Sequence, residues 1–129
     1  MRSQYQPIII LSAELSTNDY GTNEQKSFSL LSDLEQYTTM PVMGVYKGTS
    51  ERGVIVHIND DYTLSALKEL AFTKYKQESI LYRDNENKAY LHYSNGEIQY
   101  LGELKQVSEQ EALSQDAYTK TDNGYFIAK

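Results

Sequence analysis

The chain has 129 residues, a formal net charge of -6 and no cysteine, so it suits one domain with a sizeable core and has neither disulfides nor thiolate metal sites. The negative charge, together with the lack of any cluster of Lys or Arg, argues against a nucleic-acid-binding surface. No long apolar segment and no signal-peptide pattern occurs, so we expect a soluble, cytoplasmic protein that does not bind membranes.

The first part of the chain predicts a strand followed by a helix. After a loose polar lead-in, residues 1–6, the run Ile8–Leu11 is short and β-branched, which is typical of a central strand. Residues 16–22 are dense in turn formers and predict a flexible loop. Thr22 and Gln25 then match a capping box, so a helix with an apolar face is expected to begin there.

A hairpin and a second helix come next. Residues 42–46 and 54–58 predict two strands, and the seven residues between them, 47–53, predict a loop that carries two glycines. The run Asn59-Asp60-Asp61 provides a turn and places a favourable negative charge at a helix N-terminus. One face of that helix is apolar at three- and four-residue steps: Leu64, Leu67, Leu70, Ala71 and Tyr75.

The stretch Lys74–Tyr82 leads the second helix directly into a strand, and we expect the rest of the chain to be organised around it. Residues 79–83 are mostly apolar and aromatic, which suits a buried strand. Gln77 and Glu78 lie at the junction, where backbone groups are often free to contact a ligand. The same two side chains would equally suit a solvated surface turn.

The last third of the chain predicts short strands joined by turns. Residues 89–93 and 98–101 flank an Asn-Gly pair, which is a strong hairpin signal. Ser108 and Glu111 form a second capping box and predict a short helix over residues 109–117. A turn then leads into a terminal strand at 125–128.

This order of elements predicts an α+β fold. The first part has the order β-α-β-β-α-β, which favours a ferredoxin-like sandwich with a C-terminal antiparallel β extension, in one domain over residues 1–129. Two helices on one face would leave the other face of the sheet uncovered. Either the tyrosine-rich late strands or another subunit would cover it, so we expect a homo-oligomer.

The residues that could carry chemistry are carboxylates and tyrosines. Only two histidines occur and no nucleotide-binding glycine motif follows a strand, so we expect no metal and no cofactor. Glu14, Glu51 and Glu78 lie at predicted strand ends or loops, where the fold can gather them. Four tyrosine rings could join them to form a site for a small cation: Tyr46, Tyr82, Tyr90 and Tyr93. From composition alone, the same residues are explained as ordinary side chains of a sheet that have no functional role.

Several dispersed strings resemble a known family. They are Ile9-Ile10-Leu11-Ser12-Ala13, Asn23 at a helix start, Gly44-Val45-Tyr46, Val54-Ile55-Val56, and above all Tyr75-Lys76-Gln77-Glu78-Ser79-Ile80-Leu81 with Ala89-Tyr90-Leu91 behind it. Over roughly Ile8 to Val107 this pattern is similar to the small phage S-adenosylmethionine lyases, formerly described as hydrolases. The chain departs from it in the lengths of the loops around residues 16–22 and 47–53.

The resemblance implies an activity, an assembly and a site. The activity is metal-independent cleavage of S-adenosylmethionine to 5'-methylthioadenosine and homoserine lactone, which in phages depletes the methyl donor of host restriction systems in the host cytoplasm. The assembly is a homotrimer with substrate held between subunits. The site would use Glu78 and Glu51 as catalytic residues. Its substrate-binding residues would be Gln77, Ser79, Tyr46, Tyr82, Asn23 and Ser12.

Two alternatives from other functional classes stay open. A non-enzymatic, trimeric small-ligand-binding protein of the signalling type would have a similar fold and inter-subunit cleft. An acidic protein that inhibits a host enzyme by direct contact would fit the net charge.

Overall fold

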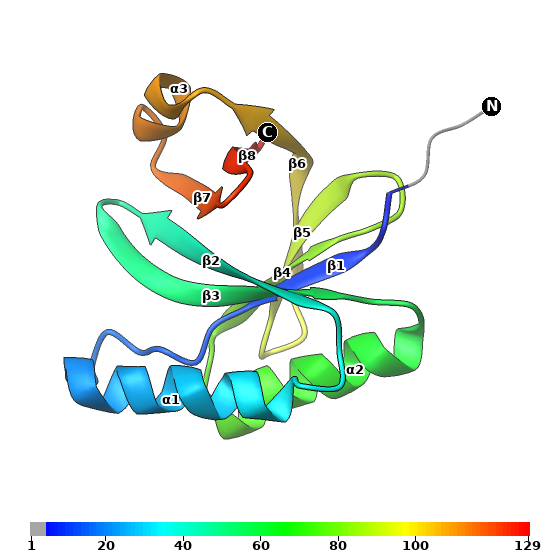
Figure 1. Ribbon diagram of the computed structural model, residues 1–129. Coiled ribbons are helices and arrows are strands. Elements are labelled where there is room, and N and C mark those ends of the chain that lie inside the picture. Colours follow the sequence, from blue (N-terminus) through cyan, green and yellow to red (C-terminus); the bar gives the residue numbers. More distant parts are fainter. Residues whose placement is uncertain (1–4) are drawn as a thin grey trace.

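A computed structural model describes residues 5–129, so most of the predicted polar lead-in, residues 1–4, lies outside the described residues. The sheet closes on itself and forms an eight-stranded antiparallel barrel in the order β1-β3-β2-β7-β8-β6-β5-β4 (Figure 1). The elements in chain order are β1 (Ile8–Leu11), α1 (Tyr20–Asp33), β2 (Thr39–Tyr46), β3 (Thr49–His57), α2 (Asp61–Glu69), η1 (Leu70–Lys74), β4 (Ser79–Arg83), β5 (Lys88–Tyr93), β6 (Ile98–Val107), α3 (Glu109–Leu113), β7 (Ala117–Thr121) and β8 (Gly124–Ala128).

The predicted ferredoxin-like sandwich is wrong, because the sheet does not stay open. The strand β7, which the sequence pattern did not reveal, pairs with β2 on one side and with β8 on the other. Strand β8 pairs in turn with β6, so the late strands complete the wall of a barrel and do not merely extend a sheet. The sheet face that was expected to be covered either by the late strands or by another subunit is therefore the inside of the barrel.

The hydrophobic core lies between the two long helices and the outer face of β1, β3 and β4. Strand alternation points every second residue of these strands toward the helices. Figure 1 shows α1 and α2 lying together on that side of the sheet. The buried cluster combines strand residues Ile9, Leu11, Val54, Val56 and Ile80 with helix residues Leu30, Leu34, Leu67, Ala71 and Tyr75. The intervening strand residues face the barrel interior, where they can line a cavity.

The second helix ends in a π-helical turn, η1, that leads the chain into β4. The backbone N–H of Tyr75 donates to the carbonyl of Leu70, five residues earlier, at 3.3 Å. The buried Tyr75 hydroxyl donates to Asp33 Oδ2 at 2.6 Å and anchors the turn to α1. Lys76 has a positive φ of 56°, which reverses the chain and delivers Gln77 to the start of β4. Turns of this kind often lie at functional sites.

The predicted seven-residue loop over 47–53 is also wrong. Lys47 and Gly48 both have positive φ, at 49° and 83°, and alone connect β2 to β3. Two such residues form the tight turn whose twist matches a hairpin. Glu51 therefore lies within β3, paired with Gly44 of β2.

The ends of the helices differ in part from expectation. Helix α1 begins at Tyr20, because the carboxylate of Asp19 accepts the N–H of Thr22 and so replaces Thr22 as the cap. The cap at Ser108 is confirmed by the bond from the N–H of Glu111 at 3.1 Å. No helix within residues 5–129 combines the length and the apolar character that crossing a membrane requires.

Candidate functional site

A cavity of about 130 Å³ lies at the end of the barrel where β1 and β2 end and where β3 and β4 begin. Because β1 pairs antiparallel with both β3 and β4, these ends meet although they are distant in sequence. Four of the predicted site residues line the cavity together: Ser12, Glu51, Gln77 and Ser79. Apolar side chains from β1, β2, β4 and β5 form the rest of its wall, including Ile10, Val42, Leu81 and Leu91.

Glu51 is half-buried, and its charge is not neutralised by a neighbour. Among residues 5–129, no Lys, Arg or His lies within ion-pair distance of its carboxylate. Burial raises the pKa of Glu51 above its usual value, the nearby hydroxyl of Ser12 partly offsets this rise, and the negative charge of Glu14 adds to it. A cation bound in the cavity would relieve this cost, so the carboxylate is prepared for a positively charged ligand.

Gln77 and Ser79 add neutral hydrogen-bonding groups to the same cavity. The Gln77 side-chain nitrogen donates to the carbonyl oxygens of Glu14 at 3.0 Å and Tyr75 at 3.3 Å. Its carbonyl oxygen accepts no bond from the part of the chain that the structure describes, so it remains available as an acceptor. The cavity therefore presents acceptors next to a carboxylate, which suits an ammonium group.

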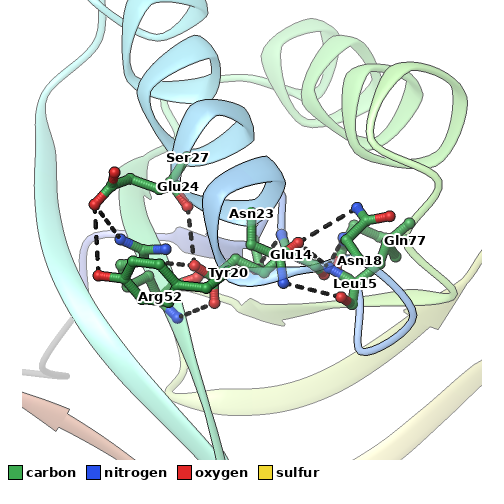
Figure 2. Close-up of polar contacts among 10 residues, drawn as sticks. Glu14, Leu15, Asn18, Tyr20, Asn23, Glu24, Ser27, Arg52 and Gln77 are labelled. Atoms are coloured by element: carbon green, nitrogen blue, oxygen red, sulfur yellow. Dashed lines mark hydrogen bonds and ion pairs between the residues drawn. The ribbon is translucent and has the colours of Figure 1, made fainter.

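Glu14 ties the edge of the cavity to its surroundings (Figure 2). Its carboxylate accepts the backbone N–H of Arg52 at 3.1 Å, a very short bond from Arg52 Nε, and the hydroxyl of Ser27 at 3.3 Å. The side chain of Glu14 is only 11% exposed, so these are charge-assisted bonds in a partly dry environment. Glu14 thus holds the segment after β1 against β3 and α1.

Helix α1 completes this network from the other side. The guanidinium of Arg52 lies 5.3 Å from the centre of the Tyr20 ring and 3.9 Å from Glu24 Oε2. Asn23 uses its amide to bind the backbone N–H and C=O of Leu15 at 2.9 and 3.0 Å. Figure 2 shows Asn23 between the helix and the preceding loop, where it fixes the loop. Its amide does not line the cavity.

Three further predicted site residues also lie outside the cavity. Glu78 is exposed, and its backbone carbonyl accepts the N–H of Ser94, whereas its carboxylate bonds to no group within residues 5–129. Tyr46 lies at the tip of the β2–β3 hairpin and is 61% exposed. Tyr82 packs on the helix side of the sheet, with its ring centre 5.5 Å from that of His92. The carboxylate and tyrosine rings that were expected to gather thus lie in separate places.

Other residues at the cavity were not expected. Gly53 lines it because β1 and β3 approach closely there: a Cβ at Gly53 would lie 2.9 Å from the carbonyl oxygen of Leu11. Arg52 was placed in a loop, but it lies in β3 and pairs with Glu14. The alternation of Glu51, Gly53 and Ile55 along one face of a strand is the signal that could have revealed this wall.

The two histidines lie away from this cavity. His92 is buried beside Tyr82 and Tyr90, and burial lowers the pKa of its imidazole. His57 lies near the opposite end of the barrel. Across residues 5–129, no three His, Asp or Glu side chains are arranged to hold a metal ion.

The comparisons with known proteins identify a family. The model of the S-adenosylmethionine lyase family matches residues 9–129, which is nearly the whole chain. A comparison with curated proteins gives no match. The family match confirms the resemblance that the dispersed strings indicated.

Proposed function

The chain belongs to the S-adenosylmethionine lyase family, and we propose that it cleaves S-adenosylmethionine to 5'-methylthioadenosine and homoserine lactone. The observation that supports this reaction best is the unneutralised carboxylate of Glu51 in an acceptor-rich cavity. The substrate carries an ammonium and a sulfonium, so such a cavity attracts it and gains from being occupied.

The reaction needs little from the protein besides geometry. One oxygen of the substrate's own carboxylate bonds to its γ-carbon, the carbon–sulfur bond breaks, and its electron pair stays on sulfur. The sulfonium becomes a neutral thioether, and no proton has to move. Nucleophile and electrophile share one molecule, so holding the folded conformer supplies much of the acceleration, up to about 7–11 kcal/mol in ideal cases. We therefore propose a metal-independent reaction.

Glu51 would act best on the substrate's ammonium group. Opposite charges on the reacting carboxylate and sulfonium cancel in the transition state, so a protein carboxylate held against the sulfonium would stabilise the ground state more and oppose the reaction. At the ammonium, Glu51 anchors the substrate and leaves its carboxylate free to attack. The carbonyl oxygen of Gln77 and the hydroxyl of Ser79 would orient the same end of the molecule.

The test is a product analysis. We expect purified protein incubated with S-adenosylmethionine and a chelator to release methylthioadenosine and lactone, as chromatography resolves them. In heavy-oxygen water the first-formed lactone should contain no label, because both of its oxygens come from the substrate. Labelled homoserine as the first-formed product would identify water as the nucleophile and contradict the proposed step. Substrate that is bound but stays intact would favour the non-enzymatic ligand-binding alternative.

We also propose a homotrimer with the site completed between subunits. The cavity of one chain, about 130 Å³, is smaller than the roughly 300–1,000 Å³ typical of small-molecule sites. A neighbouring subunit would enclose the rest of the substrate, and the exposed Glu78 and Tyr46, at the same end of the barrel, would be available to it. Light scattering should give about three times the chain mass of 14.8 kDa. An active monomer would rule out a shared site.

In a phage-infected cell, this activity would act on the host. Removing S-adenosylmethionine from the host cytoplasm would deprive restriction systems of their methyl donor and cofactor. Expression in bacteria should therefore lower the cellular pool of S-adenosylmethionine, and a Glu51→Gln protein should lower it far less.

A further inference from the structure

A second cavity, of about 190 Å³, lies at the opposite end of the barrel from the proposed substrate site. Ile10 lines both cavities, so its side chain separates two spaces inside one barrel. The walls of the second cavity are mostly apolar and come from strands on both halves of the barrel. They include Ile8, Met40, Ile55, Leu104 and Phe126.

The charged group in this cavity is the guanidinium of Arg83 at the end of β4. Its Nη1 donates to Asn87 Oδ1 at 3.0 Å, and its Nη2 donates to the carbonyl oxygen of Gln6 at 2.8 Å. Its Nε is buried and has no acceptor among the described residues, 5–129. The Tyr5 ring covers one face of the guanidinium, 5.1 Å from ring centre to Cζ. Neutral partners thus orient the group and use two of its five N–H donors.

Within residues 5–129, the nearby charge of Asp84 favours the charged form of Arg83 but does not pair with it. Arg83 forms no ion pair, and no Asp or Glu lines the cavity. Asp84 is adjacent in sequence, but its Oδ1 accepts the N–H groups of Glu86 and Lys88, each at 2.9 Å, and so closes the β4–β5 turn. Burial accordingly lowers the pKa of Arg83 from its usual value. A buried donor on an unpaired cation is costly unless an anion meets it.

The other polar residues of the cavity lie on different parts of its wall: His57 on β3, near β4 in the strand order, and Thr119 and Thr121 on β7, across the barrel from β4. The imidazole of His57 and the hydroxyls of Thr119 and Thr121 line it and can donate hydrogen bonds. An anion at Arg83 would also lie near His57, because both residues pair with Ile8 of β1, while the apolar residues would contact an uncharged body. The charge of Arg83 in this cavity is opposite to the charge of Glu51 in the first cavity, so the second cavity does not suit the cationic substrate.

We propose that this second cavity binds a small monocarboxylate with a branched aliphatic body, held by Arg83. A carboxylate fits the planar fork of a guanidinium, which favours this headgroup over an alcohol or an amine. The apolar wall accounts for the body, since each buried methylene improves affinity by about four-fold. The proposal does not depend on the lyase reaction, because it concerns a separate cavity and a ligand of opposite charge.

The test uses 4-methylpentanoate as the probe and 4-methylpentanamide as its neutral counterpart, with methyl NMR of the intact protein. We expect the carboxylate to shift the methyl signals of Ile8, Ile55 and Leu104 in a saturable way. The amide should bind at least about ten-fold more weakly, because it forfeits the charge-assisted bond. Arg83→Met should lose the same factor for the carboxylate and leave the affinity for the amide unchanged.

Two variants control for folding and for charge in general. Arg83→Lys keeps the cation but not the planar fork and should give an intermediate affinity. Lys105→Met removes an exposed cation from β6, next to Leu104 but on the outer face, and should leave the affinity unchanged. Equal binding of acid and amide by the wild-type chain would overturn the proposal, as would the absence of saturable shifts at concentrations up to about 10 mM.

Discussion

Glu51→Gln is expected to lower kcat/KM for S-adenosylmethionine by roughly 100-fold. The variant keeps the size and the hydrogen-bonding capacity of the side chain but loses the charge that meets the ammonium group. One charge-assisted hydrogen bond is worth about 1.5–3 kcal/mol, or roughly 10- to 100-fold. The loss lies at the upper end because the anchor also sets the reactive conformer, so kcat should fall as well as KM rise. Steady-state kinetics at neutral pH measure both changes.

The same substitution is expected to stabilise the folded protein at neutral pH. Burial raises the pKa of Glu51 above its ordinary value of 4.5, so the folded chain binds the proton more tightly than the unfolded chain. Below the pKa that Glu51 has in the unfolded chain, both states carry the proton, and the contribution of this proton to the stability of the folded state is fully present. That contribution is lost as the pH rises through the raised pKa of Glu51 in the folded chain. The glutamine side chain of the variant does not ionise at any of these pH values. The advantage of the variant in Tm should therefore be absent in acid and grow as pH rises to neutrality.

Two other carboxylates serve as comparisons. Glu69→Gln makes the same chemical change on the exposed side of α2, and kinetics and Tm should both stay at the wild-type values. Glu78→Gln should cost less than Glu51→Gln, because Glu78 lies outside the cavity of its own chain. A larger loss from Glu78→Gln would move the anchor to Glu78 and place it in a site formed with a neighbouring subunit.

The separation of Glu51 from Glu78 follows from strand alternation, and part of it could be read from the sequence. The strand Ser79–Arg83 was predicted with the bounds that the structure has. Within it, Ser79 and Leu81 face the cavity and Ile80 faces the helices, so Glu78 shares the orientation of Ile80, and Gln77 that of Ser79. Extending the alternation by two residues would have favoured Gln77 over Glu78 as a cavity residue.

Closure of the barrel was harder to predict, because it depends on a distant pairing. Strand β7, Ala117–Thr121, has one apolar aromatic residue among small and polar ones, and it pairs with β2 more than 70 residues earlier. The signal that was present is the pair Asn123-Gly124, which turns β7 into β8. The same Asn-Gly rule correctly predicted the earlier hairpin at Asn95-Gly96, and applying it again would have predicted β7.

The position of Glu51 was missed for a local reason. Two glycines around residues 47–53 suggested a loop, but only Gly48 has the positive φ of a turn, whereas Gly53 is a strand residue that allows β1 to approach β3. Composition alone does not distinguish these two uses of glycine. The ends of β1, β3 and β4 nevertheless gathered Ser12, Glu51, Gln77 and Ser79, because antiparallel neighbours bring opposite chain ends together.

Glu14→Gln is expected to weaken the protein and to change its pH profile in a defined direction. The Glu14 carboxylate binds the backbone and the guanidinium of Arg52 as well as Ser27, and its side chain is mostly buried. Losing the charge should cost roughly 1.5–3 kcal/mol of unfolding free energy. Because Glu14 holds the segment after β1 against β3, Ser12 and Gln77 lose support, and kcat/KM should fall by roughly ten-fold through positioning.

The pH profile distinguishes this positioning role from a general loss of stability. The negative charge of Glu14 contributes to the raised pKa of Glu51, so its removal should lower that pKa and shift the acid limb of kcat/KM to lower pH. Asp33→Asn is the matched control, because it breaks a different ion pair, between Asp33 of α1 and Lys74 of η1 at 2.7 Å, and neither of these residues lines the cavity. That variant should lose stability and leave the acid limb where it is. An acid limb that does not move in Glu14→Gln would mean that Glu51 is not the group whose ionisation controls substrate binding.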